Sequence, residues 1–100
     1  MLKIAKTYHL LPGKSISVDL PNGKVIALFN IDGIFYAIDN FCPHKGAPLA
    51  EGKLQECQIS CPWHNWKFDV TTGKSINQEG ECVKTYPLTI KGDDIYIPIK

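Results

Sequence analysis

Short apolar runs broken by turn residues dominate this sequence, and no window of eleven or more residues repeats its apolar side chains with a helical period. Asn22-Gly23, directly after the alternating segment 14–20, is the strongest short hairpin signal, and a second turn follows at 31–33. The strand-like runs are residues 14–20, 25–30, 34–39, 83–90 and 95–100. The first three predict a meander and the last two a hairpin. We therefore expect an all-β fold, an antiparallel β sandwich or small barrel.

The length of 100 residues predicts one domain that spans residues 1–100. A net charge of +1 gives no basic face suited to a phosphate backbone, so we expect no nucleic-acid partner. No apolar run approaches the roughly 18 residues of a membrane helix, and polar residues interrupt the start, unlike in a signal peptide. We expect a cytoplasmic protein without a membrane partner, whose four cysteines are ligands or free thiols.

Residues 40–56 lack a strand pattern because prolines and glycines break them, and long loops of this kind are usually functional. Cys42-x-His44 opens this loop, and Cys61-x-x-His64 follows after sixteen intervening residues. Four such ligands suit zinc or an iron–sulfur cluster. Structural zinc pairs are normally two to four residues apart, and zinc fingers place the second pair on a helix. The short first spacing and the missing helical pattern argue against a structural zinc module, which stays the remote alternative.

These segments resemble the two cluster-binding loops of the Rieske family, and the resemblance extends over residues 41–73. Its motifs are CPH at 42–44, GAPL at 46–49, Gly52, CPWH at 61–64, Phe68-Asp69 and Thr72-Gly73. The resemblance implies one [2Fe–2S] cluster, with the thiolates of Cys42 and Cys61 on one iron. The imidazoles of His44 and His64 would bind the other iron. It also implies a loop-rich cluster-binding subdomain, at about residues 40–70, inserted in the β base.

The resemblance also bears on the reduction potential. Rieske proteins of respiratory and photosynthetic complexes join the two loops by a disulfide and place two hydroxyl donors on the cluster sulfurs. Ala47 and Trp63 stand at the bridge positions here, and Trp66 and Phe68 stand at the hydroxyl positions. Hydrogen bonds to sulfur stabilise the more negative, reduced state, so their loss lowers the potential. We expect a potential in the lower part of the Rieske range.

Without an N-terminal membrane anchor, the chain resembles the soluble Rieske-type ferredoxins of bacterial aromatic-ring dioxygenases. This implies a one-electron carrier between a flavoprotein reductase and a terminal oxygenase. The alternative is the small Rieske subunit of an NAD(P)H-dependent assimilatory nitrite reductase, with the large subunit as its partner. No nucleophile–base pair, P-loop or GxGxxG motif stands out, so we expect no catalysis by this chain alone.

Five residues near or outside the motif have less specific interpretations. For Cys57 and Cys82 we favour buried free cysteines over a disulfide between them. His9 lies in an early β run without a cysteine nearby, and we expect it at the surface. Trp63 and Trp66 either pack the loops on the β core or form a surface for a partner.

Overall fold

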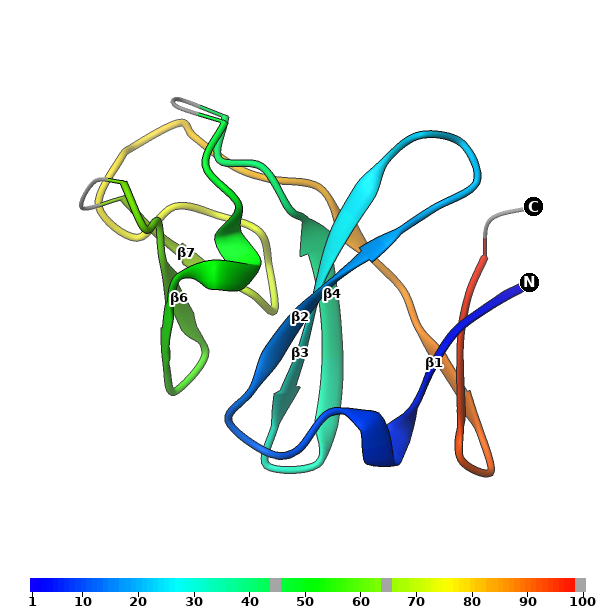
Figure 1. Ribbon diagram of the computed structural model, residues 1–100. Helices are drawn as coiled ribbons and strands as arrows, with labels where there is room; N and C mark the ends of the chain where they lie inside the picture. The colour runs from blue at the N-terminus through cyan, green and yellow to red at the C-terminus, as the bar shows by residue number, and fades with distance from the viewer. Residues whose placement is uncertain (44–45, 64–65, 99–100) are drawn as a thin grey trace.

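The computed structural model describes residues 1–43, 46–63 and 66–98, and these form three antiparallel sheets (Figure 1). The first sheet has the order β1 (Leu2–Lys6), β10 (Asp94–Ile97) and β9 (Thr89–Lys91). The second has the order β2 (Ser15–Asp19), β3 (Val25–Ile31), β4 (Ile34–Asp39) and β8 (Thr85–Tyr86). The third has the order β5 (Lys53–Gln55), β6 (Gln58–Ser60) and β7 (Lys67–Asp69). Two short 3₁₀ turns, η1 (Thr7–His9) and η2 (Leu49–Glu51), complete the fold. The predicted all-β antiparallel fold is confirmed.

The predicted meander is β2–β3–β4, and turn chemistry explains both of its reversals. Leu20 donates its N–H to Lys24 O at 2.8 Å across the Asn22-Gly23 turn. At the next turn, Asp32 and Gly33 have φ values of 53° and 89°. A type I′ hairpin turn requires this left-handed backbone at both central residues, and glycine adopts it without a steric penalty.

Strand β3 is buried on both of its faces and separates two cores. The loop-side core consists of Ala27, Phe29, Ile38, Cys42, Ala47, Leu49, Ala50, Ile59, Cys61, Phe68, Val70 and Val83. The base core consists of Leu10, Leu20, Ile26, Leu28, Ala37, Tyr86, Ile95 and Ile97. Alternate side chains of a strand point to opposite faces, so Phe29 packs in the first core and its neighbour Leu28 in the second. Full burial of a large apolar side chain such as Phe29 or Leu28 stabilises the fold by about 1.5–3 kcal/mol.

Several short elements differ from the sequence predictions. Strand β5 lies inside residues 40–56, which we expected to be loop, and it pairs with β6. These three-residue strands are too short to show a period-two pattern. Residues 83–90 form parts of two sheets, β8 and β9, because Pro87 between them has no N–H for a continuous ladder. His9 lies in η1 and not in a strand, although it is exposed as expected.

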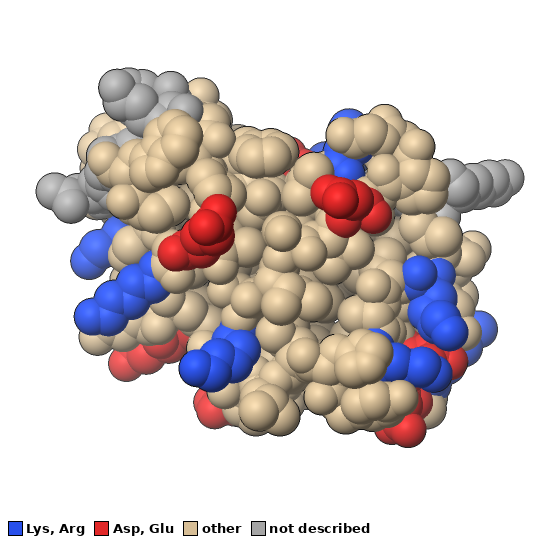
Figure 2. Space-filling model, viewed as in Figure 1, with Lys and Arg blue, Asp and Glu red and all other residues tan. Residues whose placement is uncertain are grey.

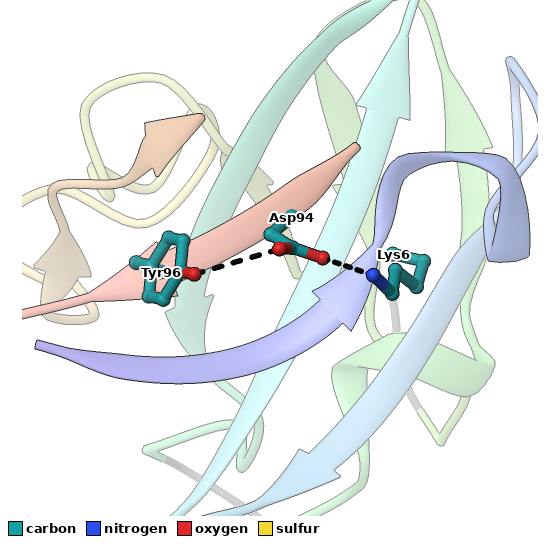
Figure 3. Close-up of polar contacts among 3 residues, drawn as sticks. All are labelled: Lys6, Asp94 and Tyr96. Atoms are coloured by element: carbon teal, nitrogen blue, oxygen red, sulfur yellow. Dashed lines mark hydrogen bonds and ion pairs between the residues drawn. The ribbon is translucent and has the colours of Figure 1, made fainter. Parts of the chain in front are cut away.

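The two ends of the chain pair as β1 and β10, and an ion pair joins them. Figure 3 shows Lys6 of β1 beside Asp94 of β10, with the Tyr96 hydroxyl on the other side of the carboxylate. Tyr96 donates to Asp94 Oδ2 at 3.5 Å. The hydrogen bond from Lys6 lowers the pKa of Asp94, and the same bond raises the pKa of Lys6. The pair therefore supports the sheet from the acid side of neutrality up to the alkaline range where lysine loses its proton.

Charged side chains are interspersed over the face shown in Figure 2, where lysines and acidic residues alternate with broad uncharged areas. This distribution agrees with the small net charge of +1. Among the described residues, no helix has the length and apolar character that crossing a membrane requires.

Two hydrogen bonds join the β8 region to Asp39, the last residue of β4, just before the first Cys/His segment. The Tyr86 hydroxyl donates to Asp39 Oδ1 at 2.5 Å, and Asp39 donates its N–H to Lys84 O at 2.9 Å. Burial raises the pKa of Tyr86 to about 12, with the hydrogen bond to Asp39 as the second cause. A raised phenol pKa means that the folded state holds this proton more tightly than the unfolded chain does.

Replacing Tyr86 by Phe should lower the free energy of unfolding at neutral pH by about 1–3 kcal/mol, because the lost hydrogen bond goes to a charged acceptor. The stabilisation is complete below the ordinary tyrosine pKa of about 10 and is lost as the pH rises towards 12. The stability difference between the two proteins should therefore shrink over that interval. Denaturant unfolding at neutral pH and near pH 12 measures it, with Tyr8→Phe, at an exposed tyrosine, as the control. Equal stabilities at neutral pH would refute the argument.

Candidate metal centre

The first Cys/His segment is an irregular hairpin at the end of β4, which we call the first hairpin (residues 40–49). Cys42 donates its N–H to Ala47 O at 2.9 Å, and Leu49 donates its N–H to Asn40 O at 2.5 Å. A bridge between residues 41 and 48 lies between these two bonds. Cys42 is therefore the last residue of the incoming stem and Ala47 the first of the outgoing stem, and the described residues Pro43 and Gly46 lie beyond this pair.

The second Cys/His segment is the hairpin made by β6 and β7, which we call the second hairpin (residues 58–69). Cys61 donates its N–H to Trp66 O at 2.8 Å, directly beyond the ladder pair Ser60 and Lys67. Pro62 and Trp63 follow Cys61 beyond the ladder. Both hairpins thus place a cysteine at the end of the incoming stem and a proline next to it. Proline suits this position because a tip residue needs no ladder N–H.

The two cysteines are brought together in one apolar environment. Cys42 and Cys61 are both buried and belong to the loop-side core. Figure 1 shows both hairpin stems at the end of the molecule that lies away from the two termini. Thiolates are soft ligands, and a buried thiolate in apolar surroundings is stabilised by a bound cation. The described donor set therefore fits an iron–sulfur cluster, whereas the predicted ligands His44 and His64 lie outside the described residues.

Two glycines of the sequence motif allow backbone segments to approach each other closely. A Cβ atom at Gly52 would lie 1.9 Å from Ser60 O, and one at Gly73 would lie 2.1 Å from Val83 O. Gly73 also has a φ of 81°, which disfavours other residues. Gly52 thus lets the segment after the first hairpin pack against β6, which leads directly to Cys61. The two hairpins are held in contact through this approach.

The four residues expected at the bridge and hydroxyl positions fall in different environments. Ala47 and Phe68 are fully buried in the loop-side core. Trp66 is half-buried against that core, and its ring centroid lies 6.4 Å from that of Phe68. Trp63 is 65% exposed. Trp66 therefore packs the second hairpin on the core, and Trp63 is the tryptophan available to a partner.

The remaining cysteines are free thiols, as expected, but they are not both buried. Cys57 is half-buried in the turn between β5 and β6, and Cys82 is exposed. Our prediction that both are buried was wrong, because Cys82 lies in an exposed loop segment outside the named strands, where it forms an isolated bridge with Lys74. Within the described ranges, no group of three or more Cys, His, Asp or Glu side chains could hold a metal ion.

Asn40 is a residue of this site that the sequence motifs did not indicate. It is 3% exposed, and its side-chain Oδ1 accepts the N–H of Ala50 at 3.0 Å. The available signal was a polar residue that ends an apolar strand directly before a cysteine motif. That signal does not identify the bond, because the partner is ten residues further along the chain.

Known proteins resemble the chain over almost its whole length. The ferredoxin component of the naphthalene 1,2-dioxygenase system of Pseudomonas aeruginosa is 36% identical over 93 residues, which are 92% of this chain and 88% of the relative. A solved structure titled as the complex of reduced oxygenase and oxidised ferredoxin in carbazole 1,9a-dioxygenase contains a similar chain. The TM-score is 0.89 at 27% identity, covering 96% of this chain and 99% of that chain.

A structure from Mycobacterium tuberculosis, named as an NADH-dependent nitrite reductase small subunit, has a TM-score of 0.88 at 24% identity. The match covers 96% of this chain and 91% of that chain, and at this identity it shows the fold alone. The family model described as the Rieske [2Fe-2S] domain matches residues 1–87. The chain therefore belongs to the Rieske [2Fe-2S] domain family, whose cofactor is one [2Fe–2S] cluster.

Proposed function

We propose that this chain is the ferredoxin component of an aromatic-ring dioxygenase system. It would accept one electron at a time from a flavoprotein reductase and pass it to a terminal oxygenase. The observation that carries this proposal is the 36% identity to such a component over 92% of the chain and 88% of the relative. The solved complex of a similar ferredoxin-sized chain with an oxygenase supports the second half of the transfer. The reductase, the substrate of the oxygenase and the cytoplasmic location remain predictions.

The proposed cluster ligands are Cys42, His44, Cys61 and His64. Support comes from the matching positions of Cys42 and Cys61 at the ends of two hairpin stems and from their shared burial. His44 and His64 belong to the tips of the same hairpins in the sequence. When bound, the [2Fe–2S] cluster supplies a reversible one-electron acceptor.

The surroundings of the cysteines suit this role. Phe68, Leu49 and Ile59 are fully buried beside them and exclude water from the thiolate side. Trp63 lies next to His64 in the sequence and exposes most of its ring. An exposed aromatic side chain beside a redox centre is a favourable contact for a partner protein.

We also propose that residues 1–100 form a single domain, with residues from about 40 to 70 as its cluster-binding subdomain. The third sheet and both Cys/His hairpins lie within that segment. The radius of gyration of 12.7 Å is close to the roughly 13 Å of one compact domain of this length.

A nitrite reductase small subunit is the second candidate function, and the similar fold of the Mycobacterium tuberculosis structure is compatible with it. Affinity purification from the native host distinguishes the two candidates. Capture of a large sirohaem protein would favour nitrite reductase. Capture of a terminal oxygenase, together with reduction of the chain by a small flavoprotein reductase, would favour the dioxygenase system.

The proposed ligands predict which cysteines the cluster requires. Cys42→Ser and Cys61→Ser should each abolish the electron paramagnetic resonance signal of the reduced protein and lower its iron content. The matched control is Cys82→Ser, an exposed cysteine outside the hairpins, which should keep both. Zinc in place of iron, without a resonance signal, would refute the cluster proposal.

The exposed indole of Trp63 predicts a contact with the electron acceptor. Trp63→Ala should slow electron transfer to the terminal oxygenase about tenfold when the concentration of this protein limits the rate. The reason is that an aromatic contact in such an interface contributes about 1–2 kcal/mol to binding. The resonance spectrum should stay unchanged. Tyr8→Ala is the matched control, since Tyr8 is similarly exposed at 62% but lies in η1. Equal rates for both variants would exclude Trp63 from the contact.

Because the buried ring of Phe68 has no hydroxyl to donate to a cluster sulfur, we expect a low reduction potential that an added hydroxyl raises. Phe68→Tyr places a hydroxyl where high-potential family members carry a donor to sulfur. A hydrogen bond that favours the reduced state by about 1 kcal/mol raises a one-electron potential by about 40 mV. Phe29→Tyr adds the same hydroxyl to another fully buried ring of the loop-side core. It should destabilise the fold without this rise. Voltammetry measures both, and a potential well above zero in the unaltered protein would contradict the prediction.

A further inference from the structure

The two hairpins that carry Cys42 and Cys61 are held at their bases in different ways. Below Cys61 the stem continues as a regular ladder of β6 with β7, and β5 adds a third strand. Below Cys42 the incoming stem continues into β4, but the outgoing stem turns into η2. The incoming stem is therefore held in the sheet between β3 and β8, but among the described residues no strand ladder joins the two stems below Asn40 and Leu49.

Asn40 closes this open base with three hydrogen bonds. Its backbone O accepts the N–H of Leu49 at 2.5 Å, and its side-chain Oδ1 accepts the N–H of Ala50 at 3.0 Å. Its own N–H donates to Val25 O of β3 at 3.1 Å. One residue thus ties both ends of the first hairpin to the strand that separates the two cores.

Burial makes the side-chain bond necessary. Asn40 is 3% exposed and Ala50 is 9% exposed, so water does not replace either partner freely. A buried N–H without an acceptor is destabilising, and the hairpin base would open to satisfy it. Ala50 is also held at its carbonyl, which accepts the Ser15 hydroxyl at 2.7 Å. Both polar groups of Ala50 are therefore fixed, and the turn that ends the first hairpin is rigid.

We propose that Asn40 is the positioning residue that fixes Cys42 relative to Cys61. Cys42 follows Asn40 by two residues on the incoming stem, and Asn40 also holds the outgoing stem through the N–H groups of Leu49 and Ala50. This inference rests on the proposed function, because it treats Cys42 as a cluster ligand. Loss of the Oδ1 acceptor would loosen the first hairpin, distort the ligand geometry and speed the loss of the cluster.

The chain contains a matched control in Asn30, which is 4% exposed. Its Nδ2 donates to Leu10 O at 2.7 Å, and its Oδ1 accepts the N–H of Gly33 at 2.8 Å. Asn30 lies on β3 near the turn to β4, and Asn40 follows the far end of β4. The two buried asparagines therefore make similar bonds at opposite ends of one strand pair, and of the two only Asn40 lies two residues from a cysteine.

The experiment compares Asn40→Ala, Asn40→Asp and Asn30→Ala in the cluster-containing protein. The measurements are the g-values of the reduced protein, the rate at which an iron chelator bleaches the visible absorption, and the free energy of unfolding. Asn40→Ala should shift the g-values and bleach about tenfold faster, the loss expected for one buried hydrogen bond. Asn40→Asp keeps an oxygen acceptor and should restore most of the slow rate. Asn30→Ala should destabilise the fold similarly but keep the unaltered g-values.

Unaltered g-values and bleaching in Asn40→Ala would overturn the proposal, and so would equal shifts in Asn30→Ala. If Asn40→Ala does not fold, hydrogen exchange of the unaltered protein decides, read by mass spectrometry at residue level. The Ala50 amide should exchange as slowly as the amides of β3, and exchange at the rate of the exposed turn at Asn22 would overturn the proposal. An unaltered protein without any resonance signal would refute the proposed function instead.

Discussion

The double-sided burial of β3 is the constraint on which the rest of the structure depends. A strand with both faces covered needs a core on each side, so the chain must build two apolar clusters around one sheet. The strands at the two ends of the chain pack against the base core, and the two hairpins pack against the loop-side core. Phe29 and Ile38 form part of the surface against which Cys42 and Cys61 are buried. The site is therefore attached to the most buried strands and not to the rim of the sheet.

The two hairpins position Cys42 and Cys61, the proposed cluster ligands, by strands and turns. Each cysteine ends a stem strand, where the last backbone hydrogen bond fixes its N–H and the following proline starts the tip. The backbone of each cysteine thus has the rigidity of its stem. The close approach at Gly52 then couples the hairpins, because a side chain there would collide with the strand that leads to Cys61.

Local chemistry decides how much of this could be predicted from the sequence. The Asn22-Gly23 turn and the alternating runs predict the meander, since both signals act within a few residues. The family motif predicts Cys42 and Cys61 as cluster ligands, and the structure buries both cysteines in one core. Strand β5 has only three residues and no readable period, and β1 pairs with the opposite end of the chain. The role of Asn40 depends on Val25, Leu49 and Ala50, which no local pattern connects to it.

The division into two cores separates stability from redox tuning. Changes in the base core or at the Lys6–Asp94 pair act on the far side of β3, so they should add independently to changes in the hairpins. The loop-side core has no such freedom. Phe68 helps to bury Cys61, and the same apolar ring offers no donor to stabilise the negative charge of the reduced cluster. At Phe68, fold stability and the expected low potential are thus coupled, and a hydroxyl introduced on this ring should alter both.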